Sequence, residues 1–160
     1  MNLRRSLVSS TLLLALATLP SIACSGGGGG NSTTNPAGTV AEMEPNDVLG
    51  NANPLGDVDR TTTLAATGRI AGLGVDQFDS YELKMTQDAT LQLSVKPSSG
   101  GSDVDLWVTS ADGTVQARFE AGAAGATETG TFAASNGDTL YLVVLAFDAD
   151  TDYELTVQGS

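Results

Sequence analysis

Apolar and polar residues alternate along most of the chain after residue 39. In one run Leu91, Leu93 and Val95 alternate with polar residues, and the same pattern recurs in runs at 80–85, 90–95, 103–108, 114–119 and 152–157. Successive side chains of a β-strand point to opposite faces, so each run predicts a half-buried antiparallel strand. Turn-forming residues separate the runs at 97–101, 111–113 and 135–138. Several short strands divided by such turns predict a sandwich or barrel.

Residues 140–147 differ because both of their faces are apolar. Leu140, Leu142 and Val144 share one face, and Val143 and Leu145 lie on the other. A strand that is apolar on both sides has to be covered on both sides, so this run is predicted to be the central strand. No long amphipathic helix is predicted, and residues 47–53 fit about one helical turn.

The first residues form a leader of a different kind. Arg4 and Arg5 supply positive charge, and residues 7–19 are almost wholly apolar. A short charged stretch followed by roughly 7–15 apolar residues is typical of a secretory signal peptide. The apolar run is shorter than the roughly 20 residues of a membrane-spanning helix. We therefore predict a cleaved signal peptide over residues 1–23.

The leader ends in the sequence PSIAC, residues 20–24. This ending resembles the bacterial lipoprotein signal, in which a cysteine receives a diacylglyceryl group and cleavage occurs directly before it. Ala23 is the small residue expected at the cut, whereas Ser21 replaces the usual Leu. The resemblance implies a lipid anchor at Cys24, and the alternative is an ordinary signal followed by a stray cysteine. Ser25 replaces the Asp that often retains lipoproteins at the inner membrane, which favours the outer membrane or cell surface.

Residues 24–39 read CSGGGGGNSTTNPAGT and contain no large apolar side chain. Gly/Ser-rich chains are flexible, and a segment of this length has an average reach of roughly 20 Å. We predict that residues 24–39 are the lipidated cysteine and a disordered tether. One folded domain then occupies residues 40–160.

Charge and composition narrow the function of that domain. The chain has 19 acidic and 7 basic residues, and loss of Arg4 and Arg5 with the leader gives a net charge of −14. Such a surface repels nucleic-acid phosphates and anionic lipid headgroups, so contact with a membrane is expected only through the anchor. The chain has no histidine and a single cysteine, which excludes imidazole-based catalysis, thiolate zinc sites and internal disulfides. Because nucleophile-elbow and phosphate-loop motifs are also absent, we expect no enzyme activity.

Several motifs in a fixed order resemble a known family. They are EMEPND at 42–47, GRI at 68–70, DQFDSYEL at 76–83, DVDLWV at 103–108 and YELTV at 153–157. Together they resemble the bacterial pre-peptidase C-terminal domain, which is similar to the collagen-binding domains of clostridial collagenases. The resemblance covers residues 42–159 and implies an all-β fold, a jelly-roll-like antiparallel β-sandwich. Domains of this family usually follow secreted proteases, whereas no protease sequence precedes this one in the chain.

The resemblance also implies a calcium site, because some members of the family bind calcium through the opening motif. Carried over residue by residue, the ligands are Glu42, Glu44, Asn46, Asp47, Asp76 and Asp79. Calcium takes oxygen ligands, and several carboxylates held close together repel one another without a cation. A bound ion would fasten the segment after the tether onto the sheet. The alternative is a metal-free acidic cap on a short helix, with Asn46 or Asp47 as the N-cap.

A second acidic cluster, DADTD at 148–152, resembles the first half of an EF-hand loop. Tyr153 stands where that loop requires Gly, and no ligating Glu follows at its end. We therefore predict a charged turn between two strands rather than a metal site.

Two functions remain open for a tethered sandwich of this kind. The first is a binding or adhesion module displayed at the cell envelope, which contacts an extracellular polymer or an envelope protein. Trp107 lies on the polar face of its strand and is a possible contact residue, unless it packs under a loop. The second is a structural or accessory lipoprotein that partners another envelope or secreted protein, for example in protease secretion, and has no ligand of its own.

Overall fold

The computed structural model describes residues 38–71, 76–120, 122–147 and 150–160. The predicted signal peptide, Cys24 and nearly all of the predicted tether lie outside these residues. In chain order the elements are β1 (Val40–Ala41), the 3-10 helix η1 (Leu49–Asn51), β2 (Asn53–Val58), β3 (Thr63–Ile70), β4 (Phe78–Met85), β5 (Ala89–Pro97), β6 (Val104–Ser110), β7 (Val115–Phe119), β8 (Glu128–Ala134), β9 (Thr139–Ala146) and β10 (Thr151–Gly159). Within the described residues no helix is long and apolar enough to cross a membrane.

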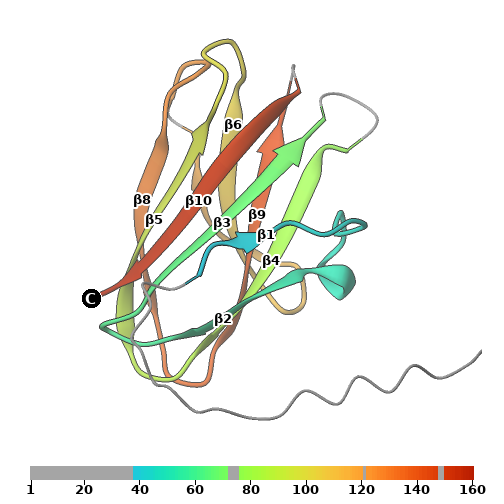
Figure 1. Ribbon diagram of the computed structural model, residues 1–160. Coiled ribbons are helices and arrows are strands. Elements are labelled where there is room, and N and C mark those ends of the chain that lie inside the picture. The colour runs from blue at the N-terminus through green and yellow to red at the C-terminus, as the bar shows by residue number, and fades with distance from the viewer. Residues whose placement is uncertain (1–37, 72–75, 121, 148–149) are drawn as a thin grey trace, which may run out of the picture. The chain divides into compact units, whose positions relative to one another are not determined.

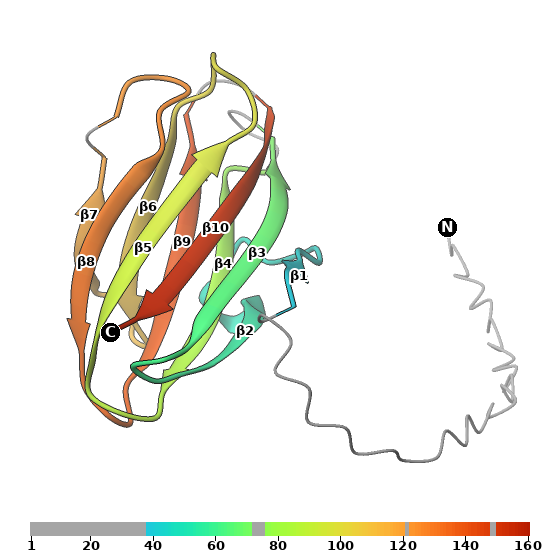
Figure 2. The ribbon, with the colours of Figure 1, turned by 60° about the vertical axis from the view of Figure 1, so that its left-hand side comes forward.

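The strands form two five-stranded sheets that pack face to face, which confirms the predicted all-β sandwich. One sheet has the strand order β1-β3-β10-β5-β8, and the other has the order β2-β4-β9-β6-β7. Figures 1 and 2 show β5 and β10 of the first sheet in front of β6 and β9 of the second.

The hydrophobic core lies between the two sheets, and its largest fully buried side chains include Tyr81, Leu106 and Tyr153. Strand β9 is the middle strand of its sheet, as its two apolar faces predicted. On its outer face Val143 is 8% exposed and Leu145 is 3% exposed, so neighbouring side chains cover that face too. Among the described residues the core draws side chains from both sheets, from Leu55 in β2 to Val157 in β10. The segment 38–160 is therefore expected to fold by itself.

The sandwich is not wholly antiparallel, which corrects part of the expectation drawn from the family resemblance. In the described residues β1 pairs with β3 and β2 pairs with β4 in parallel, whereas the other pairings are antiparallel. Both parallel additions are edge strands, where an irregular strand is tolerated. Strand β2 contains Pro54, which has no N–H to donate, and its register shifts between Pro54 and Gly56.

Candidate metal centre

The segment that follows β1 is hydrogen-bonded to both sheets. The Glu42 N–H donates to the carbonyl oxygen of Thr67 in β3 over 2.9 Å. Four residues further along, the Asn46 carbonyl oxygen accepts a hydrogen bond of 3.2 Å from the N–H of Ser80 in β4. Residues 42–46 therefore bridge β3 of one sheet and β4 of the other.

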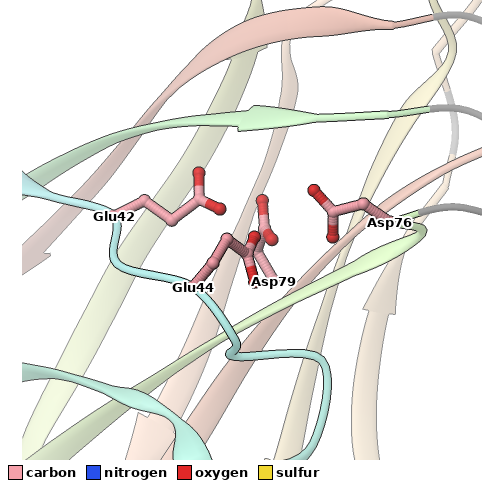
Figure 3. Close-up of side chains that lie close together, drawn as sticks. All are labelled: Glu42, Glu44, Asp76 and Asp79. Atoms are coloured by element: carbon pink, nitrogen blue, oxygen red, sulfur yellow. The ribbon is translucent and has the colours of Figure 1, made fainter.

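This bridge brings four carboxylates together, those of Glu42, Glu44, Asp76 and Asp79. Each offers one oxygen, and these oxygens all lie within 4.8 Å of one another. Figure 3 shows the four side chains pointing toward a common space: Glu42 and Glu44 come from the segment after β1, Asp76 from just before β4 and Asp79 from within it. Asp79 is fully buried, Glu42 and Asp76 are half-buried, and Glu44 is exposed.

Several polar atoms at this place are buried without a hydrogen-bond partner. They include both carboxylate oxygens of Asp79, Oδ1 of Asp76, and both amide atoms of Asn46, which is 0% exposed. None of the ion pairs among the described residues involves a member of the four-carboxylate cluster. Buried polar groups in native proteins are nearly always satisfied, and buried charges are nearly always paired or bound to metal. These atoms therefore need a positively charged partner, and the described residues do not supply one.

The raised pKa values of the cluster carboxyl groups agree with the absence of a positively charged partner among the described residues. Burial raises the pKa of Glu42, and the neighbouring Glu44 side chain raises it further. Burial also raises the pKa of Asp79, with smaller contributions from the charges of Asp76 and Glu44, although the approach of the Tyr153 hydroxyl opposes the change. The pKa of Asp76 rises to about 6, mainly through burial and then through the charges of Glu44 and Asp47. A divalent cation would relieve this repulsion, because it favours the ionised form of each carboxylate.

The walls of the cluster are shaped by Gly68 and Tyr153. The N–H of Arg69 donates to Glu42 Oε2 over 2.6 Å, which holds that carboxylate against β3. A Cβ atom on Gly68 would overlap both the Glu42 carboxylate and the Tyr153 hydroxyl. The Tyr153 hydroxyl is in turn hydrogen-bonded to the Tyr81 hydroxyl over 2.7 Å in the core. Sequence reasoning missed this support, although Gly68 and Tyr153 both fall within the motifs that it singled out.

Of the six predicted ligands, the structure brings Glu42, Glu44, Asp76 and Asp79 into one cluster. The backbone N–H of Asn46 donates to Glu44 Oε2 over 3.0 Å, and the Asn46 side-chain amide is buried without a hydrogen-bond partner among the described residues. Asp47 is exposed and close enough to Asp76 to raise its pKa. The alternative of an N-capped helix is wrong. The N-cap of η1 is Val48, and no side chain caps it.

Trp107 lies half-buried on the outer face of β6. The guanidinium of Arg118 in β7 sits 4.4 Å from the centre of its ring, and the indole N–H donates to Glu120 Oε1 over 2.7 Å. The indole therefore packs against Arg118 of β7 and against Glu120, the residue directly after that strand. Its role as a contact residue stays a prediction, and any partner at Trp107 would also meet Arg118 and Glu120.

Part of the second acidic cluster belongs to a strand, because β10 begins at Thr151. Asp150 forms an ion pair of 3.7 Å with Arg69, and both side chains are largely exposed. Residues 148 and 149 of the predicted charged turn lie outside the described residues.

Asp105 is a buried carboxyl outside the cluster, 7% exposed and the second residue of β6. Its pKa rises to about 6, mainly through burial and then through the charges of Asp103, Glu120 and Glu128. The folded state thus holds the Asp105 proton more tightly than the unfolded state does. The stability that this proton contributes is fully present below about pH 4 and is lost as the pH rises through about 6.

We expect Asp105→Asn to leave the free energy of unfolding unchanged at pH 4 and to raise it by about 1–3 kcal/mol at pH 7.5. Urea unfolding of the wild type and the variant at both pH values measures this difference in the free energy of unfolding. The carboxylate cluster is the same in both proteins, so its own titration cancels when they are compared at one pH. Asp57→Asn, at an exposed position of β2, is the control for loss of a surface carboxylate and should change the free energy of unfolding by less than about 0.5 kcal/mol. An equal effect of Asp105→Asn at both pH values would contradict the conclusion that the fold raises the pKa of Asp105.

These features define a two-sheet β-sandwich with a cluster of oxygen ligands where the chain enters the fold. No family model and no curated protein matches the chain by sequence. Among solved structures, it is similar to the pre-peptidase C-terminal domain of collagenase from Bacillus anthracis, with 23% identity and a TM-score of 0.53. That similarity covers 73% of this chain and 100% of the other. It shows that the fold is that of a pre-peptidase C-terminal domain, as the motifs implied.

Two weaker similarities are to PliG, a periplasmic inhibitor of g-type lysozyme. The Aeromonas hydrophila protein has 13% identity and a TM-score of 0.42, over 68% of this chain and 99% of its own. The Salmonella Typhimurium protein has 13% identity and a TM-score of 0.41, over 68% of this chain and 100% of its own. At these scores neither similarity carries an argument about function.

Proposed function

We propose that this chain is a non-catalytic envelope lipoprotein that displays a calcium-stabilised β-sandwich as a binding or adhesion module. The observation that carries the proposal is the cluster of four carboxylates where the chain enters the sandwich. The sequence adds a signal peptide, the lipidation position Cys24 and a glycine-rich tether before that point. We call the calcium ion held by Glu42, Glu44, Asp76 and Asp79 the calcium clamp. The lipid anchor, the tether, the calcium clamp and the sandwich then follow one another along the chain in the order that a displayed domain needs.

Calcium is the cation that suits this donor set. Every donor in the cluster is a carboxylate oxygen, and the Asn46 amide can add a neutral oxygen. Hard oxygen donors favour calcium or magnesium over zinc, which prefers nitrogen and sulfur. A flexible set of monodentate and bidentate carboxylates suits calcium better than the strict octahedron of magnesium. Glu42, Glu44, Asp76 and Asp79 would hold the ion, with Asn46 and Asp47 as further ligands.

The position of the cluster explains what the ion would do. Strand β1 has two residues, so its pairing with β3 is short and easily frayed. Any pull on the tether reaches the sandwich through this strand. A cation bound by Glu42 and Glu44 on one side and by Asp76 and Asp79 on the other would fasten the segment after β1 to β4. The same ion would neutralise the charge of the buried Asp79, for which the described residues supply no cationic partner.

The anchor is tested by intact-mass analysis of the mature protein from membranes of a bacterial host. We expect a chain that begins at Cys24 and carries the added mass of a diacylglyceryl group, because the cysteine thiol is the acceptor. Cys24→Ser should lose that mass and move the protein from the membrane fraction to the soluble exported fraction.

Ser25→Ala is the control and should remain acylated, because it leaves the thiol in place. A wild-type chain that is cleaved elsewhere, or that carries Cys24 as a free thiol, would contradict the anchor. Such a result would leave the calcium clamp to be tested on the sandwich alone.

A further inference from the structure

The outer face of the first sheet contains a groove of about 340 Å³. None of the residues that line it belongs to the carboxylate cluster. It lies over β8, β5 and β10, the strands at the front of Figure 1. The side chains that line its outer face are Gln92, Ser94, Thr129, Thr131, Thr156 and Gln158. Buried Leu93 of β5 and Gly130 of β8 complete the lining.

The groove side chains form two rows across the three strands. In the first row Ser94 of β5 lies opposite Thr129 of β8 and Thr156 of β10. In the second row Gln92 lies opposite Thr131 and Gln158. Neighbouring strands are about 4.8 Å apart, so each row presents a polar group at about that interval. The first row has hydroxyls only, and the longer glutamines of the second row form a wall beside it.

The chemistry of the lining is unusual for this chain. None of the six side chains is charged, although the chain has 19 acidic residues. No hydrogen bond joins these six side chains to other described residues, so their donors and acceptors are all available. A hydroxyl donates and accepts, and a glutamine amide offers two donors and a carbonyl acceptor. The groove is thus a set of neutral, two-way hydrogen-bonding groups at regular spacing.

We propose that this groove binds a neutral glycan chain laid across β8, β5 and β10. Sugar hydroxyls also donate and accept, and neighbouring hydroxyls match the paired donor and acceptor of a glutamine amide. The strand spacing is close to the length of one sugar unit in an extended glycan, so successive units meet equivalent groups. An anionic polymer is disfavoured by the chain's net charge of −12, and a cationic one finds no carboxylate in the lining.

This inference rests on the proposed function, because it names the ligand class of the displayed module. The two can fail separately. Loss of glycan binding would leave the calcium clamp and the Cys24 anchor intact, and a calcium-insensitive, non-acylated chain could still bind glycan through the groove. Because the groove is open and relies on hydrogen bonds that compete with water, we expect a dissociation constant of about 1 mM.

The experiment is a titration of ¹⁵N-labelled residues 38–160, in saturating calcium, with cellohexaose, maltohexaose and chitohexaose, followed by NMR chemical shifts. At about 10 mM of a bound glycan, roughly nine-tenths of the protein should be occupied. The shifts should centre on residues 92–94, 129–131 and 156–158. In the double variant Gln92→Ala/Gln158→Ala we expect the dissociation constant to rise about tenfold, which reduces occupancy at that concentration to about half.

Gln87→Ala is the matched control, because Gln87 is exposed in the turn before β5 and outside the groove. All three substitutions are at the surface, so the folded ¹⁵N spectrum should be retained. The inference is overturned if none of the three glycans shifts the groove resonances, or if the double variant binds as the wild type does. It is equally overturned if the shifts centre on Trp107, or if dextran sulfate binds more tightly than every neutral glycan.

Discussion

Saturating calcium raises the melting temperature of the sandwich, residues 38–160, by about 10 °C relative to the same protein in chelator. A ligand that binds only the folded state at 100 times its dissociation constant stabilises that state by about 2.7 kcal/mol. For a domain of this size each kcal/mol corresponds to about 3–5 °C. The effect is expected to be large because the ion would pair with the buried Asp79 carboxylate, for which the described residues supply no positively charged partner. Differential scanning calorimetry in chelator and in millimolar calcium measures the shift.

Asp79→Asn separates the cluster from general effects of salt. This variant keeps the size of the side chain and removes the buried charge, so its melting temperature in chelator should equal or exceed that of the wild type. Its response to calcium should fall to less than about a quarter of the wild-type shift, because one central ligand loses its charge. Asp57→Asn removes a charge from the exposed face of β2 and should retain the full response. Superimposable wild-type melts in chelator and calcium would refute the clamp.

Alternation in the sequence was sufficient to predict most of the fold. The runs around Leu91, Leu106 and Leu155 became β5, β6 and β10, and the doubly apolar run became the central strand β9. Strands β3 and β8 and the two parallel edge strands were not predicted in this way. Strand β2 is interrupted by Pro54 and Gly56, and β1 has two residues, so neither has an alternating pattern to detect. Their positions depend on contacts with β4 and β3 rather than on local preference.

The candidate site, too, was predicted only in part from the sequence. The family resemblance implied all of the ligands, Glu42 and Glu44 in the opening motif and Asp76 and Asp79 in a later one. Their convergence depends on pairing between β1 and β3 and on the hydrogen bond from Ser80 to Asn46, which no local pattern reveals. The groove on β5 was missed for a different reason. Its residues look like the ordinary polar face of a half-buried strand, and only the register across three strands distinguishes them.

Gly68→Ala is expected to abolish the calcium response, although no ligand is changed. Gly68 lies in β3, and an added methyl group would overlap the carboxylate of Glu42 and the hydroxyl of Tyr153. Because Tyr153 is buried and bonded to Tyr81, it cannot move far, so Glu42 has to leave its hydrogen bond with the Arg69 N–H. We expect a loss of about 1–3 kcal/mol in chelator from overpacking. The calcium-induced shift in melting temperature should fall below about 2 °C.

Two further variants test whether the methyl group of Gly68→Ala acts through Glu42. Glu42→Gln removes the ligand charge and should also lose most of the calcium response, while the metal-free sandwich stays folded. If both substitutions act on the same carboxylate, their effects will not add. The calcium-induced shift in melting temperature of the double variant Gly68→Ala/Glu42→Gln will then be no smaller than the smaller of the two single-variant shifts. Gly101→Ala is the matched control, because a Cβ atom there meets nothing within 4 Å. A normal calcium response in Gly68→Ala would show that Glu42 is not a ligand and that the ion, if bound, is held by Glu44, Asp76 and Asp79 alone.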